Sequence, residues 1–185
     1  MSRFQVRPSM TLPAVALALL RCSGATAEVI DAEASGFTTR HSVTVSRPRA
    51  EVYKAATAGI GSWWSDDHTV SGRAANMYLE PRVQGCFCER LGEQGGVVHM
   101  LVTFVNPAVM LRLSGGLGPL GLMGVSGNMT WEFTDSADGT TMTWSYAVGG
   151  YFPGGLDQIS SAVDLVLTEQ MNQFKKFAEE SRATP

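Results

Sequence analysis

The stretch NMTWEFTDSADGTTMTWSYAV (residues 128–148), followed by GLDQISSAVDLVLTEQMNQFKKFAEE (residues 155–180), decides the fold. In the first part, alternate residues are large and apolar, which predicts two strands, 128–134 and 140–148, joined by an Asp138-Gly139 turn. In the second part, apolar residues recur with the helical period, which predicts a long amphipathic helix. A strand hairpin followed by such a helix is typical of a sheet that packs on a helix.

Shorter patterns upstream extend this sheet. Alternation over residues 37–45 predicts a strand with Thr39, His41 and Val43 on one face, and the helical pattern after it ends at Gly59. Four further strands are predicted, at residues 77–80, 85–90, 96–105 and 110–114. The predicted fold class is therefore α+β: an antiparallel sheet in meander order, one or two short helices after the first strand, and a C-terminal helix.

The composition indicates one compact domain. The chain has 185 residues, of which 44% are hydrophobic and 17% are charged. Its formal net charge is −3, and no run of Lys and Arg is long enough to follow a phosphate backbone. We therefore expect no nucleic-acid partner, whereas the oligomeric state does not follow from the sequence.

Residues 1–27 have the order of a secretory signal. Arg3 and Arg7 precede an apolar run over residues 10–20, and small residues end the segment at Ala27, after which we predict cleavage. The apolar run is too short to cross about 30 Å of hydrocarbon, so we expect a periplasmic or secreted protein without a stable membrane anchor. The alternatives are a lipid anchor on Cys22 and an apolar leader that is never used.

Five short motifs, taken in order, resemble a known superfamily. They are VTVSRPRAEVY at residues 43–53, Trp63-Trp64, EPRVQG at residues 80–85, Asn106-Pro107 and GTTMT at residues 139–143. Together they resemble the SRPBCC (START and birch-pollen-allergen-like) superfamily, over roughly residues 38–180. Within it, the sequence is most similar to the branch named for the activator of heat shock protein 90 ATPase, which contains bacterial homologues.

The resemblance implies a helix-grip fold, in which the sheet curls around the C-terminal helix and encloses a hydrophobic cavity. Members of the superfamily bind lipids, polyketides or other apolar molecules, and some act on them as cyclases or aromatases. Export would separate this protein from cytosolic chaperones, so the resemblance implies ligand binding more directly than chaperone activation.

Several residues are candidates for contact with an apolar ligand in such a cavity. Trp144 and Tyr146 combine a large apolar ring with a polar atom, Gln170 lies in the middle of the apolar helix face, and His99 lies in an apolar strand. The alternative for each is a structural role in a filled core. The full set of predicted ligand-binding residues is Trp64, Tyr78, His99, Met129, Trp131, Trp144, Tyr146, Val163, Leu167, Gln170 and Phe174.

Other motifs predict less. Cys86 and Cys88 lie two apart on a strand, about 7 Å at Cα, so they are interpreted as two small buried residues and not as a disulfide or a metal site. The polar run Asp66-Asp67-His68 is interpreted as a solvated loop. The glycine-rich segment 114–127 is interpreted as a mobile apolar lid or a plain loop. No metal or cofactor is expected.

These observations favour an exported protein that binds a small apolar molecule between its sheet and its last helix. The sequence shows no arrangement of nucleophile, base and orienting group, so we lean against an enzyme. The alternatives are a cyclase-like enzyme, with His99 or Tyr146 transferring a proton, and a protein-interaction module related to chaperone activators.

Overall fold

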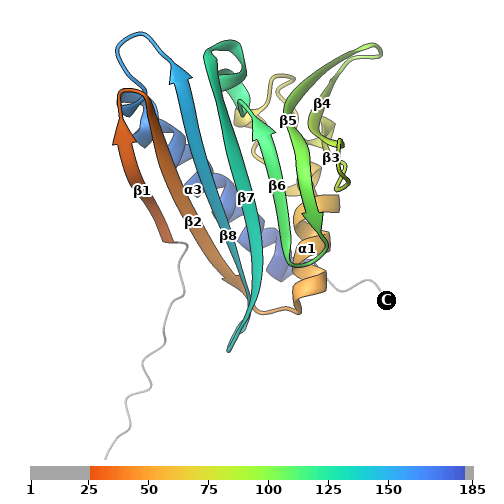
Figure 1. Cartoon of the computed structure of the whole chain (residues 1–185). Helices are drawn as coiled ribbons and strands as arrows, with labels where there is room; N and C mark the ends of the chain where they lie inside the picture. The colour runs from red at the N-terminus through yellow and green to blue at the C-terminus, as the bar shows by residue number, and fades with distance from the viewer. Residues whose placement is uncertain (1–25, 182–185) are drawn as a thin grey trace, which may run out of the picture.

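The computed structural model describes residues 26–181 and confirms the predicted fold class. One curved antiparallel sheet wraps around a long C-terminal helix, which is the helix-grip fold (Figure 1). The strand order is β1-β2-β8-β7-β6-β5-β4-β3. The strands are β1 (Thr26–Glu33), β2 (Gly36–Val45), β3 (Met77–Leu79), β4 (Cys86–Leu91), β5 (Gly95–Asn106), β6 (Met110–Gly115), β7 (Gly124–Ser136) and β8 (Gly139–Tyr151). The α-helices are α1 (Arg49–Ala58), α2 (Ile60–Trp63) and α3 (Asp157–Glu180), and short 3-10 turns span Asp66–His68, Ala74–Asn76 and Gly118–Leu122.

The two faces of the sheet follow from the alternation in the sequence. On β2, Thr39, His41 and Val43 are buried, while Arg40 and Thr44 lie on the opposite face. Residues of β7 and β8 alternate in the same way, and their register places Trp131 opposite Trp144. The buried face of the sheet is therefore lined mainly by large apolar side chains.

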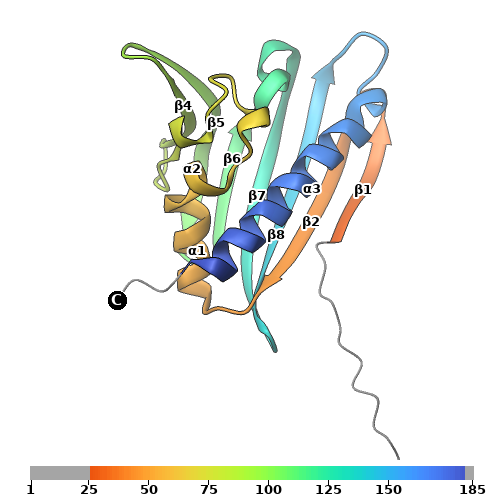
Figure 2. The same ribbon diagram turned by 180° about the vertical axis from the view of Figure 1, so that it is seen from behind.

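Helix α3 covers this buried face. Figure 2 shows it lying diagonally across β2 and β8, with α1 and α2 beside it over the other half of the sheet. Its fully buried side chains include Leu167, Gln170, Met171 and Phe174. The interior of the molecule is thus the layer between α3 and the sheet.

The sheet begins earlier in the chain than the sequence pattern indicated. Strand β1 pairs with β2 ahead of the predicted domain start at residue 38, and it is mostly exposed, which explains its weak hydrophobic pattern. The predicted signal peptide falls on residues 1–25, which lie outside the described residues, and on the first two residues of β1.

The interpretation of Cys86 and Cys88 as separate buried residues is wrong. The two sulfurs form a disulfide, with the Cα atoms 5.4 Å apart. This separation is shorter than the roughly 7 Å between residues two apart on a regular strand. The pairing of β4 with β5 also shifts register at this point, between Phe87 and Cys88.

The middle of the glycine-rich segment connects β6 to β7, so strands flank it as expected, and its two ends, residues 114–115 and 124–127, lie within these strands. It contains the 3-10 turn Gly118–Leu122, in which Leu120 is buried and Leu122 is exposed. Within residues 26–181, no helix is both long and apolar enough to span a membrane.

Candidate functional site

Most of the predicted ligand-binding residues meet in the interior between α3 and the sheet. The buried ones are Trp64, His99, Met129, Trp131, Trp144, Tyr146, Leu167, Gln170 and Phe174. They come from both layers. Strands β7 and β8 turn alternate residues inward, β5 turns His99 inward, Trp64 follows α2, and α3 presents one face to the sheet. The interior is therefore the candidate site.

Two predicted residues lie apart from this group. Tyr78 is half-buried on β3, and the guanidinium carbon of Arg90 lies 4.4 Å from the centre of its ring. Val163 is half-buried on α3 and packs against the edge of the core.

All four tryptophans of the chain form one aromatic layer in the interior. Trp144 is at its centre, with ring centroids 5.0 Å from Trp131, 6.0 Å from Trp63 and 6.4 Å from Trp64. Phe174 on α3 closes the layer against Trp63 at 5.2 Å. The rings pack directly on one another, so they also have the core-filling role that was the alternative to ligand contact.

The indole N–H groups of this layer differ in their hydrogen bonding. Trp63 donates to the carbonyl of Ala55, Trp64 donates to the carbonyl of His68, and Trp131 donates to Met129 Sδ at 3.0 Å. Trp144 Nε1 is buried and has no partner among residues 26–181. Such an unpaired donor costs about 1–3 kcal/mol, so the site favours an acceptor at this point.

Gln170 supplies a second unpaired donor. Its side chain is fully buried, and its Oε1 accepts a hydrogen bond from the backbone N–H of Ser65 at 2.9 Å. Because that N–H can only donate, the bond fixes the amide orientation and leaves Nε2 without a partner in the described part of the chain. Ser65 follows Trp64 in the chain, and Trp64 stacks on Trp144. Both unpaired donors therefore belong to the same region of the interior.

The hydroxyl of Tyr146 is engaged by the backbone. It donates to the carbonyl of Gly115 at 3.2 Å and accepts from the N–H of Leu117 at 3.1 Å. Burial raises the pKa of the phenol to about 12, so it stays neutral. Tyr146 thus holds the first residues of the glycine-rich segment against the sheet.

His99 forms a buried pair with Glu89. The register shift between β4 and β5 leaves His99 as the extra residue of β5, so it turns inward beside Met100. Its Nε2 lies 3.1 Å from Glu89 Oε2. Its Nδ1 is buried and has no hydrogen-bond partner within residues 26–181.

Glu89 is held in its ionised form. Its carboxylate accepts from the backbone N–H groups of Val70 and Ser71 as well as from His99. Burial alone would raise the pKa of this carboxyl, but these hydrogen bonds together lower it below its usual value. His99 Nε2 therefore donates to this carboxylate, so in the neutral ring the proton lies on Nε2 and Nδ1 carries a lone pair.

One further buried polar group, around His41, was not assigned a role from the sequence. His41 on β2, which is 1% exposed, faces Asp164 and Thr168 on α3. Burial lowers the pKa of His41, and the nearby Asp164 carboxylate opposes that shift only in part. From the sequence, only the position of His41 on the inward face of β2 indicated that it is buried. Its partners on α3 could not be identified, because they lie more than a hundred residues away in the chain.

The polar loop has structural partners of its own. Asp66 Oδ1 accepts from the N–H of Ala74 at 2.6 Å, and His68 Nε2 lies 3.1 Å from Glu169 Oε2. No group of three or more potential metal ligands occurs among residues 26–181.

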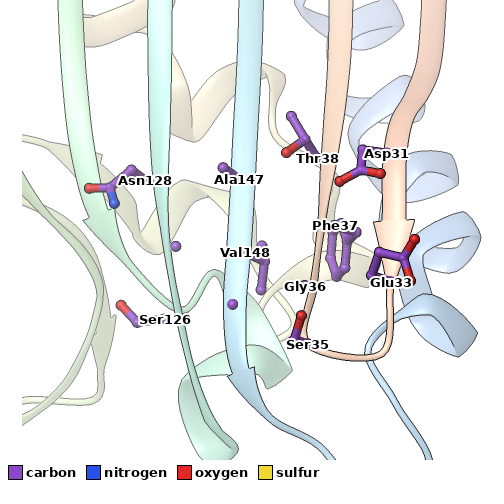
Figure 3. Close-up of a pocket in the computed structure, with 12 residues that line it drawn as sticks. Asp31, Glu33, Ser35, Gly36, Phe37, Thr38, Ser126, Asn128, Ala147 and Val148 are labelled. Carbon is purple, nitrogen blue, oxygen red and sulfur yellow. The ribbon is translucent and has the colours of Figure 1, made fainter.

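A separate depression lies on the outer face of the sheet, across β1, β2, β8 and β7. Figure 3 shows Asp31 and Glu33 on one side of it and Asn128 on the other, with Ala147 between them. It is open, has a volume of about 380 Å³ and has polar groups along its edge. It therefore lies outside the predicted interior site and is less suited to an apolar molecule.

Comparison with known proteins places the fold. No family model matches the sequence, and the search of curated proteins found no match. A solved structure from Rhizobium leguminosarum is 16% identical and has a TM-score of 0.61, covering 85% of this chain and 99% of the other. DynU16, from the dynemicin biosynthetic locus, is 18% identical with a TM-score of 0.55, over 77% of this chain and 47% of the other. The Aha1 dimer from Colwellia psychrerythraea is 14% identical with a TM-score of 0.53, over 79% and 98%. At these identities, the likeness shows a shared helix-grip fold.

Proposed function

We propose that this protein binds a small apolar molecule carrying a hydrogen-bond acceptor oxygen, in the interior between α3 and the sheet. The observation that carries the proposal is the pair of unpaired donors, Trp144 Nε1 and Gln170 Nε2, among fully buried apolar rings. A carbonyl, ether or hydroxyl oxygen would satisfy them, and the rings would supply the apolar contact.

Other observations support this function at a coarser level. One structural neighbour comes from a biosynthetic locus, and the shared fold is compatible both with ligand binding and with cyclase-like chemistry. Fold alone does not choose between these, so the choice depends on the polar groups of the interior.

We also propose that the protein is exported. The N-terminal sequence has the order of a cleavable signal, and the Cys86–Cys88 disulfide is the kind of bond that persists outside the cytoplasm.

Native mass spectrometry of the protein purified from its own cell envelope tests both proposals. We expect a chain that begins after Ala27 and carries a copurifying apolar molecule. Trp144→Phe should weaken binding of that molecule about tenfold, since it removes one hydrogen bond. Trp131→Phe is the matched control, because its N–H already has a partner in Met129. Equal retention in the two variants would contradict the donor role of Trp144, and a protein recovered empty would contradict the carrier function.

A proton-transfer enzyme is the second candidate, and the Glu89–His99 pair favours it. A carboxylate that fixes one imidazole nitrogen and leaves the other with a free lone pair is an arrangement that suits a general base. If the copurifying molecule is a substrate, His99→Gln should abolish its turnover and change its affinity little. A carrier would show no turnover in either protein.

A further inference from the structure

The group formed by His41, Asp164 and Thr168 has no role in the function proposed above. His41 and its neighbour Thr39 project from β2 toward α3, and Thr39 is fully buried. Three side-chain atoms here have no hydrogen-bond partner among residues 26–181: Thr39 Oγ1, His41 Nε2 and Asp164 Oδ1. Three unpaired atoms in one part of a buried layer point to a bound polar group.

The bonding of Thr168 determines the tautomer of His41. The Thr168 hydroxyl donates its hydrogen to the backbone carbonyl of Asp164 at 2.8 Å. Its oxygen lies 3.4 Å from His41 Nδ1 and can only accept there. The proton of a neutral His41 therefore lies on Nδ1, and Nε2 carries a lone pair.

This lone pair faces a second acceptor. His41 Nε2 lies 3.4 Å from Asp164 Oδ1, but the two atoms are not aligned as a hydrogen bond. A proton on Nε2 would join them, but burial disfavours the charged imidazole. With a neutral imidazole, two acceptors face each other, and a donor placed between them would satisfy both.

We propose that His41 and Asp164 bind the hydroxyl hydrogen of the interior ligand. This inference rests on the function proposed above and narrows the ligand to a hydroxylated apolar molecule. The register of β2 and β8 places His41 directly opposite Trp144, and such cross-strand neighbours have Cβ atoms about 5 Å apart. The side chains that carry the donor Trp144 Nε1 and the acceptor His41 Nε2 are thus cross-strand neighbours, so we expect one ligand to reach both.

The test compares probes that differ only in this hydrogen. Binding of 2-naphthol and 2-methoxynaphthalene, and of 1-decanol and decyl methyl ether, is measured by native mass spectrometry with the full chain. Because all four probes have an acceptor oxygen, we expect all to bind, and we expect each hydroxyl compound to bind about tenfold more tightly than its ether. Equal affinities would overturn the hydroxyl subsite and leave the proposed function standing. Failure of all four to bind would contradict the proposed function itself.

The variant Asp164→Asn sharpens the test. Its amide can donate to His41 Nε2 and replace the ligand hydroxyl, so the preference for hydroxyl compounds should disappear while binding of the ethers persists. Asp138→Asn, in the exposed β7–β8 turn, is the matched control and should keep the preference. A preference that survives Asp164→Asn would overturn the assignment.

A water molecule, instead of a ligand hydroxyl, could also donate to His41 Nε2 and Asp164 Oδ1. The nitrogen NMR signals of the three histidines report whether His41 Nε2 is hydrogen-bonded. We expect the Nε2 signal to shift when 2-naphthol binds. A signal that already has its hydrogen-bonded position in the free protein, and does not move, would show that water alone occupies the subsite and would overturn the proposal.

Discussion

Thr39 and Thr140 are both fully buried threonines on strands, but only one of their hydroxyls has a partner. Thr140 donates to the carbonyl of Arg47 at 2.7 Å, whereas Thr39 Oγ1 has no partner in the described part of the chain. The hydroxyl of Thr39 is therefore a desolvated polar group that contributes nothing to folding unless a ligand or water binds it.

This contrast predicts opposite effects of the same substitution. Thr39→Val should raise the free energy of unfolding by about 1 kcal/mol, because it removes an unsatisfied group and keeps the side-chain shape. Thr140→Val should lower it by about 1–2 kcal/mol, because it removes a buried hydrogen bond and leaves the Arg47 carbonyl without that donor. Urea unfolding of the two variants measures both values. A loss of stability in Thr39→Val as large as that in Thr140→Val would show that Thr39 is satisfied in the folded protein.

The β6–β7 connection is the element that the Tyr146 hydroxyl controls. Its bonds to Gly115 and Leu117 hold the chain where the glycine-rich segment leaves the sheet, next to the buried Leu120. Tyr146→Phe should therefore lower stability by about 1 kcal/mol and speed amide hydrogen exchange selectively over residues 115–123. Mass spectrometry of the exchanged peptides measures the second effect.

Tyr151→Phe is the matched control, since Tyr151 is 74% exposed and should leave exchange in this segment unchanged. Exchange that rises equally in both variants, or in neither, would show that the segment is held by its other contacts.

The sequence predicted those features of the strands and helices that depend on neighbouring residues, and missed those that depend on how two strands pair. The period of the side chains predicted the inward face of β2 and the buried face of α3, because alternation and helical spacing are local properties. The register shift at Phe87, which turns His99 inward, depends on how two strands pair and leaves no mark in the spacing of either strand.

The candidate site was predicted less completely for the same reason. Gln170 could be identified as a polar residue on an apolar helix face, but its bond to Ser65 depends on how α3 crosses the sheet. The contact of His41 with Thr168, 127 residues away in the chain, depends on the same packing. Local patterns indicate which residues are inside, whereas the pairing of polar atoms follows from the assembled layers.

At the scale of the whole molecule, the buried His41 makes folding sensitive to acid. Its pKa in the folded state lies below the ordinary value of 6.5, because burial disfavours the charged ring more than Asp164 favours it. The unfolded chain therefore binds a proton more readily, so the full stability is present above about pH 6.5 and decreases as the pH falls below it, by at most about 1.4 kcal/mol per pH unit. Glu89, whose pKa is lowered in the folded state, adds a further loss of stability only below about pH 4.5.

Urea midpoints measured between pH 7 and pH 5.5 should fall for the natural chain and stay nearly level for His41→Gln. His68→Gln, which changes a more exposed histidine, should keep the slope of the natural chain. A level profile in the natural chain would mean that folding leaves the pKa of His41 unchanged.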